Sequence, residues 1–119
     1  MNKYQAIHSF WSGFGIPAYD QSTVPESAEL PYITYDVYEG GYDETVPLSA
    51  SIWWKSKSWS EITAKLTEVS EKIGTGIYAV YDGGAILIVK GLPFAQRVTD
   101  EDDSVRRILI NVNAEFIGE

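Results

Sequence analysis

The stretch 105–116, VRRILINVNAEF, decides the fold. Its inward-facing apolar positions recur at every second residue and are Ile108, Ile110, Val112, Ala114 and Phe116. A period of two is typical of a β-strand that lays one face on a core. The acidic run 100–103 directly before it predicts a solvated turn. The sequence therefore predicts a long closing strand with Arg107 and Leu109 on its outward face. At about 3.3 Å per residue it would extend roughly 40 Å, so it either bends or projects to pair with another subunit.

Two helices are predicted from apolar residues at helical spacing. The apolar stripe of the first comprises Tyr4, Ile7, Trp11 and Phe14. The second spans 58–73, where Ser58 and Glu61 have the spacing of a capping box. Its stripe comprises Ile62, Leu66, Val69 and Ile73. Gly13 and Gly15 are expected to end the first helix, and Gly74 and Gly76 the second, because glycine readily adopts the conformation that terminates helices.

The remaining segments alternate between β-prone runs and turns. Strands are predicted at 32–38, 48–55, 77–81 and 85–89. The first two are close enough to pair antiparallel, with Trp53 facing outward. Asp82-Gly83-Gly84 predicts a hairpin between the last two. Gly91-Leu92-Pro93 is expected to interrupt the sheet before a short strand at 94–98, and the proline-containing segment 15–31 is expected to form a loop of functional importance.

This order of elements predicts an α+β fold in a single domain over residues 1–119. We expect a two-layer sandwich, in which a mainly antiparallel sheet of about four to five strands carries two helices packed on one face. The chain lacks cysteine, which excludes disulfides and thiolate chemistry. It also shows no apolar stretch of membrane-spanning length and no signal peptide, so no membrane association is expected.

The charge of the chain is strongly acidic, with a formal net value of −8. No basic stripe is present, so tight nucleic-acid binding is not expected. His8 is the sole histidine, and we expect it to be structural or solvent-facing. The acidic run 100–103 lacks the spaced ligands and the glycine of a calcium loop. We therefore expect no enzymatic activity, no catalytic residue, no cofactor and no metal site.

The aromatic content is the more informative feature, with eight Tyr, four Trp and four Phe in 119 residues. A small domain cannot bury all of them, and Tyr and Trp are enriched where proteins meet. Together with the outward residues of the closing strand, they define a candidate oligomer or partner interface: Tyr38, Tyr42, Trp53, Trp59, Arg107 and Leu109.

The element order resembles the tail-completion and tail-terminator proteins of long-tailed bacteriophages and prophages. The resemblance is carried by the N-terminal helix, the segment 29–35 (ELPYITY), the helix at 58–73 and the strand 106–112 (RRILINV). It implies a non-enzymatic, α+β homo-oligomer that forms a ring, commonly a hexamer, where the tail meets the capsid. The implied partners are other tail or connector proteins, and the implied location is the virion, after assembly in the host cytoplasm.

Two alternatives stay open. The same layout could serve other phage structural proteins that join head and tail, including neck and minor capsid components. The acidity also fits a binding module of the inhibitor or immunity type, which would cap a basic partner.

Overall fold

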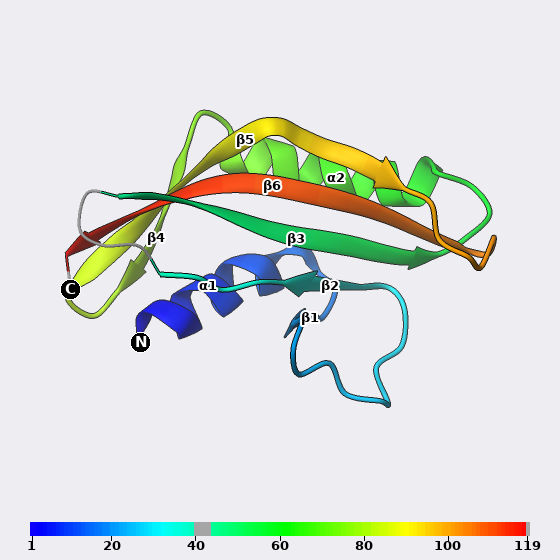
Figure 1. Ribbon diagram of the computed structural model, residues 1–119, viewed down its shortest axis with the longest axis horizontal. Coiled ribbons are helices and arrows are strands. Elements are labelled where there is room, and N and C mark those ends of the chain that lie inside the picture. Colours follow the sequence, from blue (N-terminus) through cyan, green and yellow to red (C-terminus); the bar gives the residue numbers. More distant parts are fainter. Residues whose placement is uncertain (40–43, 119) are drawn as a thin grey trace.

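Six strands form one sheet in the order β1-β2-β3-β6-β5-β4 within residues 1–39 and 44–118, which the computed structural model describes (Figure 1). The elements in chain order are α1 (Lys3–Trp11), the 3-10 turn η1 (Ser12–Phe14), β1 (Ala18–Asp20), β2 (Tyr32–Tyr35), β3 (Thr45–Lys55), α2 (Ser60–Ile73), β4 (Ile77–Tyr81), β5 (Gly84–Val98) and β6 (Val105–Gly118). All neighbouring strands pair antiparallel except β1 and β2, which are parallel.

The closing strand β6 lies at the centre of the sheet, where it pairs with β3 on one side and β5 on the other. The predicted alternation is confirmed, because all five inward residues, Ile108, Ile110, Val112, Ala114 and Phe116, are buried. Pairing to β3 reaches Glu115 and pairing to β5 reaches Gly118. Both edges of β6 are therefore occupied up to Glu115, and residues 116–118 pair with β5 alone. Among the described residues β6 stays within its own sheet, so no projecting end is seen.

The α+β class is confirmed, but the sheet has six strands instead of about four to five, and it is curled instead of forming the predicted two-layer sandwich. Both helices contribute buried residues to one core, Ile7 and Trp11 from α1 and Ile62 and Val69 from α2. The sheet curls, so that its two edge strands β1 and β4 both contact α1, whereas α2 packs against β3, β5 and β6. Long strands accumulate right-handed twist, which explains why the sheet bends around a helix instead of forming a flat layer.

The first helix begins with a capping box that the sequence reading missed. The Asn2 side chain accepts a hydrogen bond from the Gln5 backbone, and the Gln5 side chain accepts one from the Asn2 backbone, each at 2.9 Å. The predicted stripe is largely confirmed, although Tyr4 is 52% exposed and Phe10 takes the buried position instead. The left-handed residue Gly15, with φ of 79°, ends the helical region as expected.

The predicted capping box of the second helix does not form. The helix begins at Ser60, and Trp59 occupies the N-cap position without a side-chain cap. The Ser58 hydroxyl accepts a hydrogen bond from the Ser60 N–H at 3.1 Å, instead of from the Glu61 N–H that a capping box would use. The Glu61 carboxylate accepts from the indole N–H of Trp54 at 3.2 Å. Glu61 therefore ties α2 to β3 and does not close its own helix end.

The segment expected to interrupt the sheet is a bulge inside one long strand, β5. Residues 91–94 lie opposite Asn111 alone in the pairing of β5 with β6. The Asn111 amide donates a hydrogen bond to the Pro93 carbonyl at 3.1 Å. A Cβ on Gly91 would lie 2.9 Å from the Asn111 carbonyl oxygen, so only glycine allows this close approach.

The predicted loop 15–31 contains a short strand, β1, that hydrogen-bonds to β2. The Ile33 N–H donates to the Pro17 carbonyl, and the Gln21 N–H donates to the Tyr35 carbonyl, each at 2.9 Å. Antiparallel pairing of β2 with β3 is confirmed, although β2 ends at Tyr35. The rest of the segment, residues 21–31, extends away from the sheet as a long loop (Figure 1).

Candidate assembly surfaces

The sheet surface that faces away from both helices is called the outer face. It includes Ser49, Ser51 and Trp53 from β3, Arg107, Leu109 and Asn111 from β6, and Gln96 and Val98 from β5. On β6 the outward residues 107, 109 and 111 are half-buried, whereas each inward neighbour is buried. Within the described residues no further layer covers this face, and Arg107 is the one charged residue of the set just named.

Trp53 and Arg107 form a stacked pair at the centre of this surface. They are direct cross-strand partners, and the guanidinium carbon lies 4.6 Å from the indole ring centroid. Arg107 Nε donates to Ser51 Oγ at 3.0 Å, and Trp53 Nε1 donates to Thr34 Oγ1 at 2.9 Å. These bonds fix two large side chains in place, so a partner could bind them with little loss of side-chain entropy.

The structure brings three of the six predicted interface residues together, since Leu109 pairs with Ser51 beside the Trp53–Arg107 pair. Tyr38 follows β2 and is 57% exposed, outside the sheet. Tyr42 lies outside the described residues.

Trp59 lies on the opposite side of the sheet, next to the core. The Arg97 and Arg106 guanidinium groups lie 4.5 Å and 5.3 Å from its ring centroid. Arg106 also donates to the Lys57 carbonyl at 2.6 Å and to the Asp103 carbonyl at 2.9 Å. This cluster holds the start of α2 against the acidic turn, and it shares no surface with Trp53.

His8 joins α1 to β2. Its Nδ1 lies 2.9 Å from the Tyr35 hydroxyl and its Nε2 lies 3.2 Å from the Ser12 hydroxyl. Burial raises the pKa of Tyr35, so this phenol stays neutral at physiological pH. Both imidazole nitrogens thus have structural partners, which agrees with the structural role expected for this residue.

The acidic turn is stabilised by its own side chains. The Asp102 carboxylate accepts hydrogen bonds from the Ser104 hydroxyl and N–H at 2.6 Å and 2.8 Å, which lowers its pKa. Asp100 accepts from the Asp102 N–H at 3.0 Å. Across the described residues, no group of three or more His, Cys, Asp or Glu side chains is arranged to hold a metal ion.

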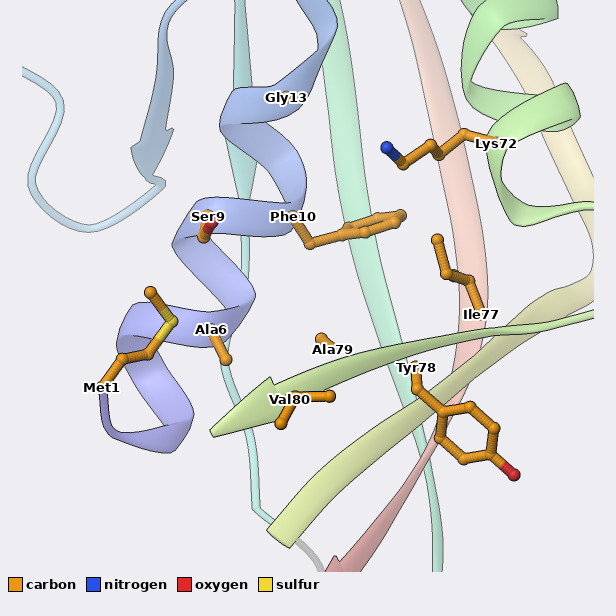
Figure 2. A pocket seen from close by; sticks show the side chains of 10 residues that line it. All are labelled: Met1, Ala6, Ser9, Phe10, Gly13, Lys72, Ile77, Tyr78, Ala79 and Val80. Carbon is orange, nitrogen blue, oxygen red and sulfur yellow. The ribbon is translucent and has the colours of Figure 1, made fainter. Parts of the chain in front are cut away.

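A second surface, which the sequence did not predict, is a groove of about 280 Å³ between α1 and the edge strand β4 (Figure 2). Its floor includes buried Ala6 and Phe10, with Ile77 and Ala79 of β4 beside them. Lys72 extends from α2 toward α1 across the groove (Figure 2). The signal that could have revealed it is the sequence of β4, IYAVY, which has neither charge nor proline.

Comparison with known proteins gives a fold but no family. The chain matches no protein-family model, and no curated protein matches it. Among solved structures, it is similar to a chain described as "Virion of native gene transfer agent (GTA) particle", with a TM-score of 0.65 and 17% identity. The match covers 97% of this chain and 91% of that chain. No helix among the described residues is both long enough and apolar enough to cross a bilayer.

Proposed function

We propose that this chain is a non-enzymatic structural protein of a bacteriophage or prophage particle. The observation that carries the proposal is the fold shared, over nearly the full length of both chains, with a component of a gene transfer agent virion, which is a phage-like particle. Within such particles, we assign it to tail completion, tail termination or head–tail joining. It would act as a homo-oligomeric ring, assembled in the host cytoplasm with other phage structural proteins.

The outer face supports assembly on physical grounds. Two copies that each carry a net charge of −8 repel one another unless they meet through surfaces of low charge. The centre of the outer face meets that condition, because serine, asparagine and glutamine surround the stacked pair of Trp53 and Arg107. Ordered Trp and Arg side chains are also the residues that most often dominate binding energy at protein interfaces.

Mass photometry at micromolar concentration, with and without purified tail tubes, tests the proposal. We expect a discrete oligomer, and electron microscopy of that oligomer would give the ring order. The double variant Arg107→Ala/Leu109→Ala should weaken assembly roughly tenfold or more, because it removes two half-buried, ordered side chains at the centre of the outer face. Glu71→Ala, an exposed change on α2, is the matched control.

A protein that stays monomeric under both conditions would contradict the ring. If it captured instead a basic partner from a phage or host lysate, in a manner that weakens steeply with salt, the inhibitor-like alternative would be favoured.

A further inference from the structure

We propose that the groove between α1 and β4 receives the loop 21–31 of a second copy of this chain. The contact is head-to-tail, with the loop of each subunit seated against the edge strand of the next. The inference rests on the proposed function in that it names the contact through which such a ring could close.

The first argument is the open edge of β4. The strand order ends at β4, so one of its edges pairs with β5 and the other pairs with no strand among the described residues. Tyr78 is 59% and Val80 is 69% exposed, and neither is accompanied by a charge or a proline within the strand. Apolar edges without charge or proline can accept an extended segment, which adds backbone hydrogen bonds to the sheet.

The second argument is the charge at the groove. Lys65 forms an ion pair with Glu68 at 2.9 Å, and the Lys90 ammonium donates to the Ser70 hydroxyl at 2.8 Å. Lys72 has no hydrogen bond or ion pair with any described residue, and its side chain extends toward the groove (Figure 2). An occupant that carries a carboxylate would supply the missing partner.

The third argument is the composition of the loop. It presents Glu26 and Glu29, both exposed and both without a hydrogen bond or ion pair to any described residue. The half-buried apolar residues Val24 and Leu30 flank them. At about 3.3 Å per residue, each arm of this loop can reach roughly 15 Å, which is enough to enter a neighbouring subunit.

The position of the loop makes the contact directional. The loop leaves the sheet between β1 and β2, whereas β4 is the strand at the opposite end of the sheet order. Figure 1 shows the loop and β4 toward opposite ends of the long axis of the molecule. A loop cannot fill the groove of its own chain in this arrangement. A contact between two different surfaces, repeated around an axis, closes into a ring.

Charge reversal with rescue tests the pairing. Lys72→Glu alone, or Glu26→Lys/Glu29→Lys alone, should weaken self-association about tenfold in sedimentation velocity, because each places like charges together. Combining the three changes should restore association to within about threefold of the wild type. Glu71→Lys, next to Lys72 and outside the groove lining, is the matched control. Single variants without effect, or a triple variant without rescue, would overturn the pairing.

Mixing a variant of the groove with a variant of the loop distinguishes this head-to-tail contact from a symmetric contact. A variant with a blocked groove, Ala79→Glu, retains its loop, and the variant Glu26→Lys/Glu29→Lys retains its groove. At a concentration where each variant alone is monomeric, the mixture should form a one-to-one dimer that grows no further. An equal mixture that forms no dimer, or that forms full oligomers, would overturn the head-to-tail contact.

A peptide spanning residues 20–32 keeps the inference testable even if the wild-type chain proves monomeric. Titrated into the ¹⁵N-labelled protein, it should shift the amide resonances of β4 and of α1, and Ala79→Glu should abolish those shifts. Absence of shifts at β4 would refute the groove assignment while leaving the ring proposal standing. A wild-type monomer that binds the peptide would instead count against the ring alone.

Discussion

The two edges of the sheet differ in length and chemistry. β1 has three residues, follows Pro17 and ends in Asp20, whose carboxylate accepts hydrogen bonds from the Ser22 N–H at 2.9 Å and hydroxyl at 2.7 Å. β4 has five residues, none of them charged. Short length, proline and charge are the devices by which proteins block unwanted strand pairing. One edge strand of this sheet therefore carries these devices, and the other carries neither charge nor proline.

This asymmetry bears on assembly. If both edges were open, sheets could add to one another without limit, as in fibrils. With β1 protected, an occupant of the β4 edge is expected to be a part of a neighbouring molecule other than its β1. The difference between the edges thus argues against unlimited edge-to-edge addition of sheets.

The largest expected effect comes from the strand that holds the two edges in place. Ile110 of β6 is fully buried, so Ile110→Ala should lower the free energy of unfolding by about 3 kcal/mol through lost packing and a residual cavity. Urea denaturation measures this. Leu109→Ala, on the outer face of the same strand, should cost clearly less. Equal costs would mean that the outer face is covered as completely as the core.

Gly84→Ala should destabilise the edge strand β4 more than the edge strand β1. A Cβ at this position would lie about 2 Å from the backbone oxygen of Ile117, so the β4–β5 hairpin has to shift. We expect a loss of about 2 kcal/mol and faster amide exchange in β4 than in β1. The control is Gly13→Ala, where a Cβ meets nothing within 4 Å and stability should stay within about 0.5 kcal/mol.

One substitution can add a charge to the edge strand β4, and another can remove the charge at the end of the edge strand β1. Val80→Lys should change stability by less than about 0.5 kcal/mol, since this side chain is 69% exposed, yet weaken self-association about tenfold. Asp20→Asn keeps the turn geometry and removes only the charge, so association should change little. Sedimentation velocity at one salt concentration compares both. If Asp20→Asn had the larger effect on association, β1 would be the docking edge.

The smallest effect is a pH dependence near the protected edge. Burial raises the pKa of Asp36, and repulsion from Asp20 adds to the increase, although the Ser49 N–H donates to its carboxylate at 2.8 Å. A raised pKa in the folded state means that stability is lost as the pH rises from the ordinary value of 3.8 through the folded value. Asp36→Asn should therefore be more stable than wild type at pH 7, and the difference should vanish below pH 3.8. A difference that persists at low pH would point to a cause other than ionisation.

The sequence predicted the elements whose patterns depend on local chemistry. The alternation in 105–116, the stripe of α2 and the Asp82-Gly83 turn all report local periodicity or turn preference, and all three are confirmed. Alternation also identified the outward positions of Trp53, Arg107 and Leu109.

Features that depend on distant contacts were not predictable. β1 is a strand because β2 offers it hydrogen bonds, although its sequence is proline-flanked and only three residues long. The segment 91–94 stays in the sheet because Asn111 accommodates the bulge. Trp59 and Trp53 both looked like surface aromatics, but Arg97 and Arg106 hold the first against the core side of the sheet. The uncharged sequence of β4 indicates an apolar edge, but the groove also depends on where α1 packs, which the sequence of β4 does not show.

The central place of β6 also sets the order in which this chain can fold. β4 and β5 form a local hairpin. The pairing of β3 with β6, in contrast, joins residues far apart in the sequence, from Thr45 with Glu115 to Lys55 with Val105. Pairings this remote in sequence slow folding, because the chain loses the entropy of loop closure before the stabilising contacts can form. The outer face takes residues from β3, β6 and β5, so it does not exist as a surface until β3 has paired with β6. We expect the chain to become competent to assemble only when folding is complete, which would keep incompletely folded subunits out of an oligomer.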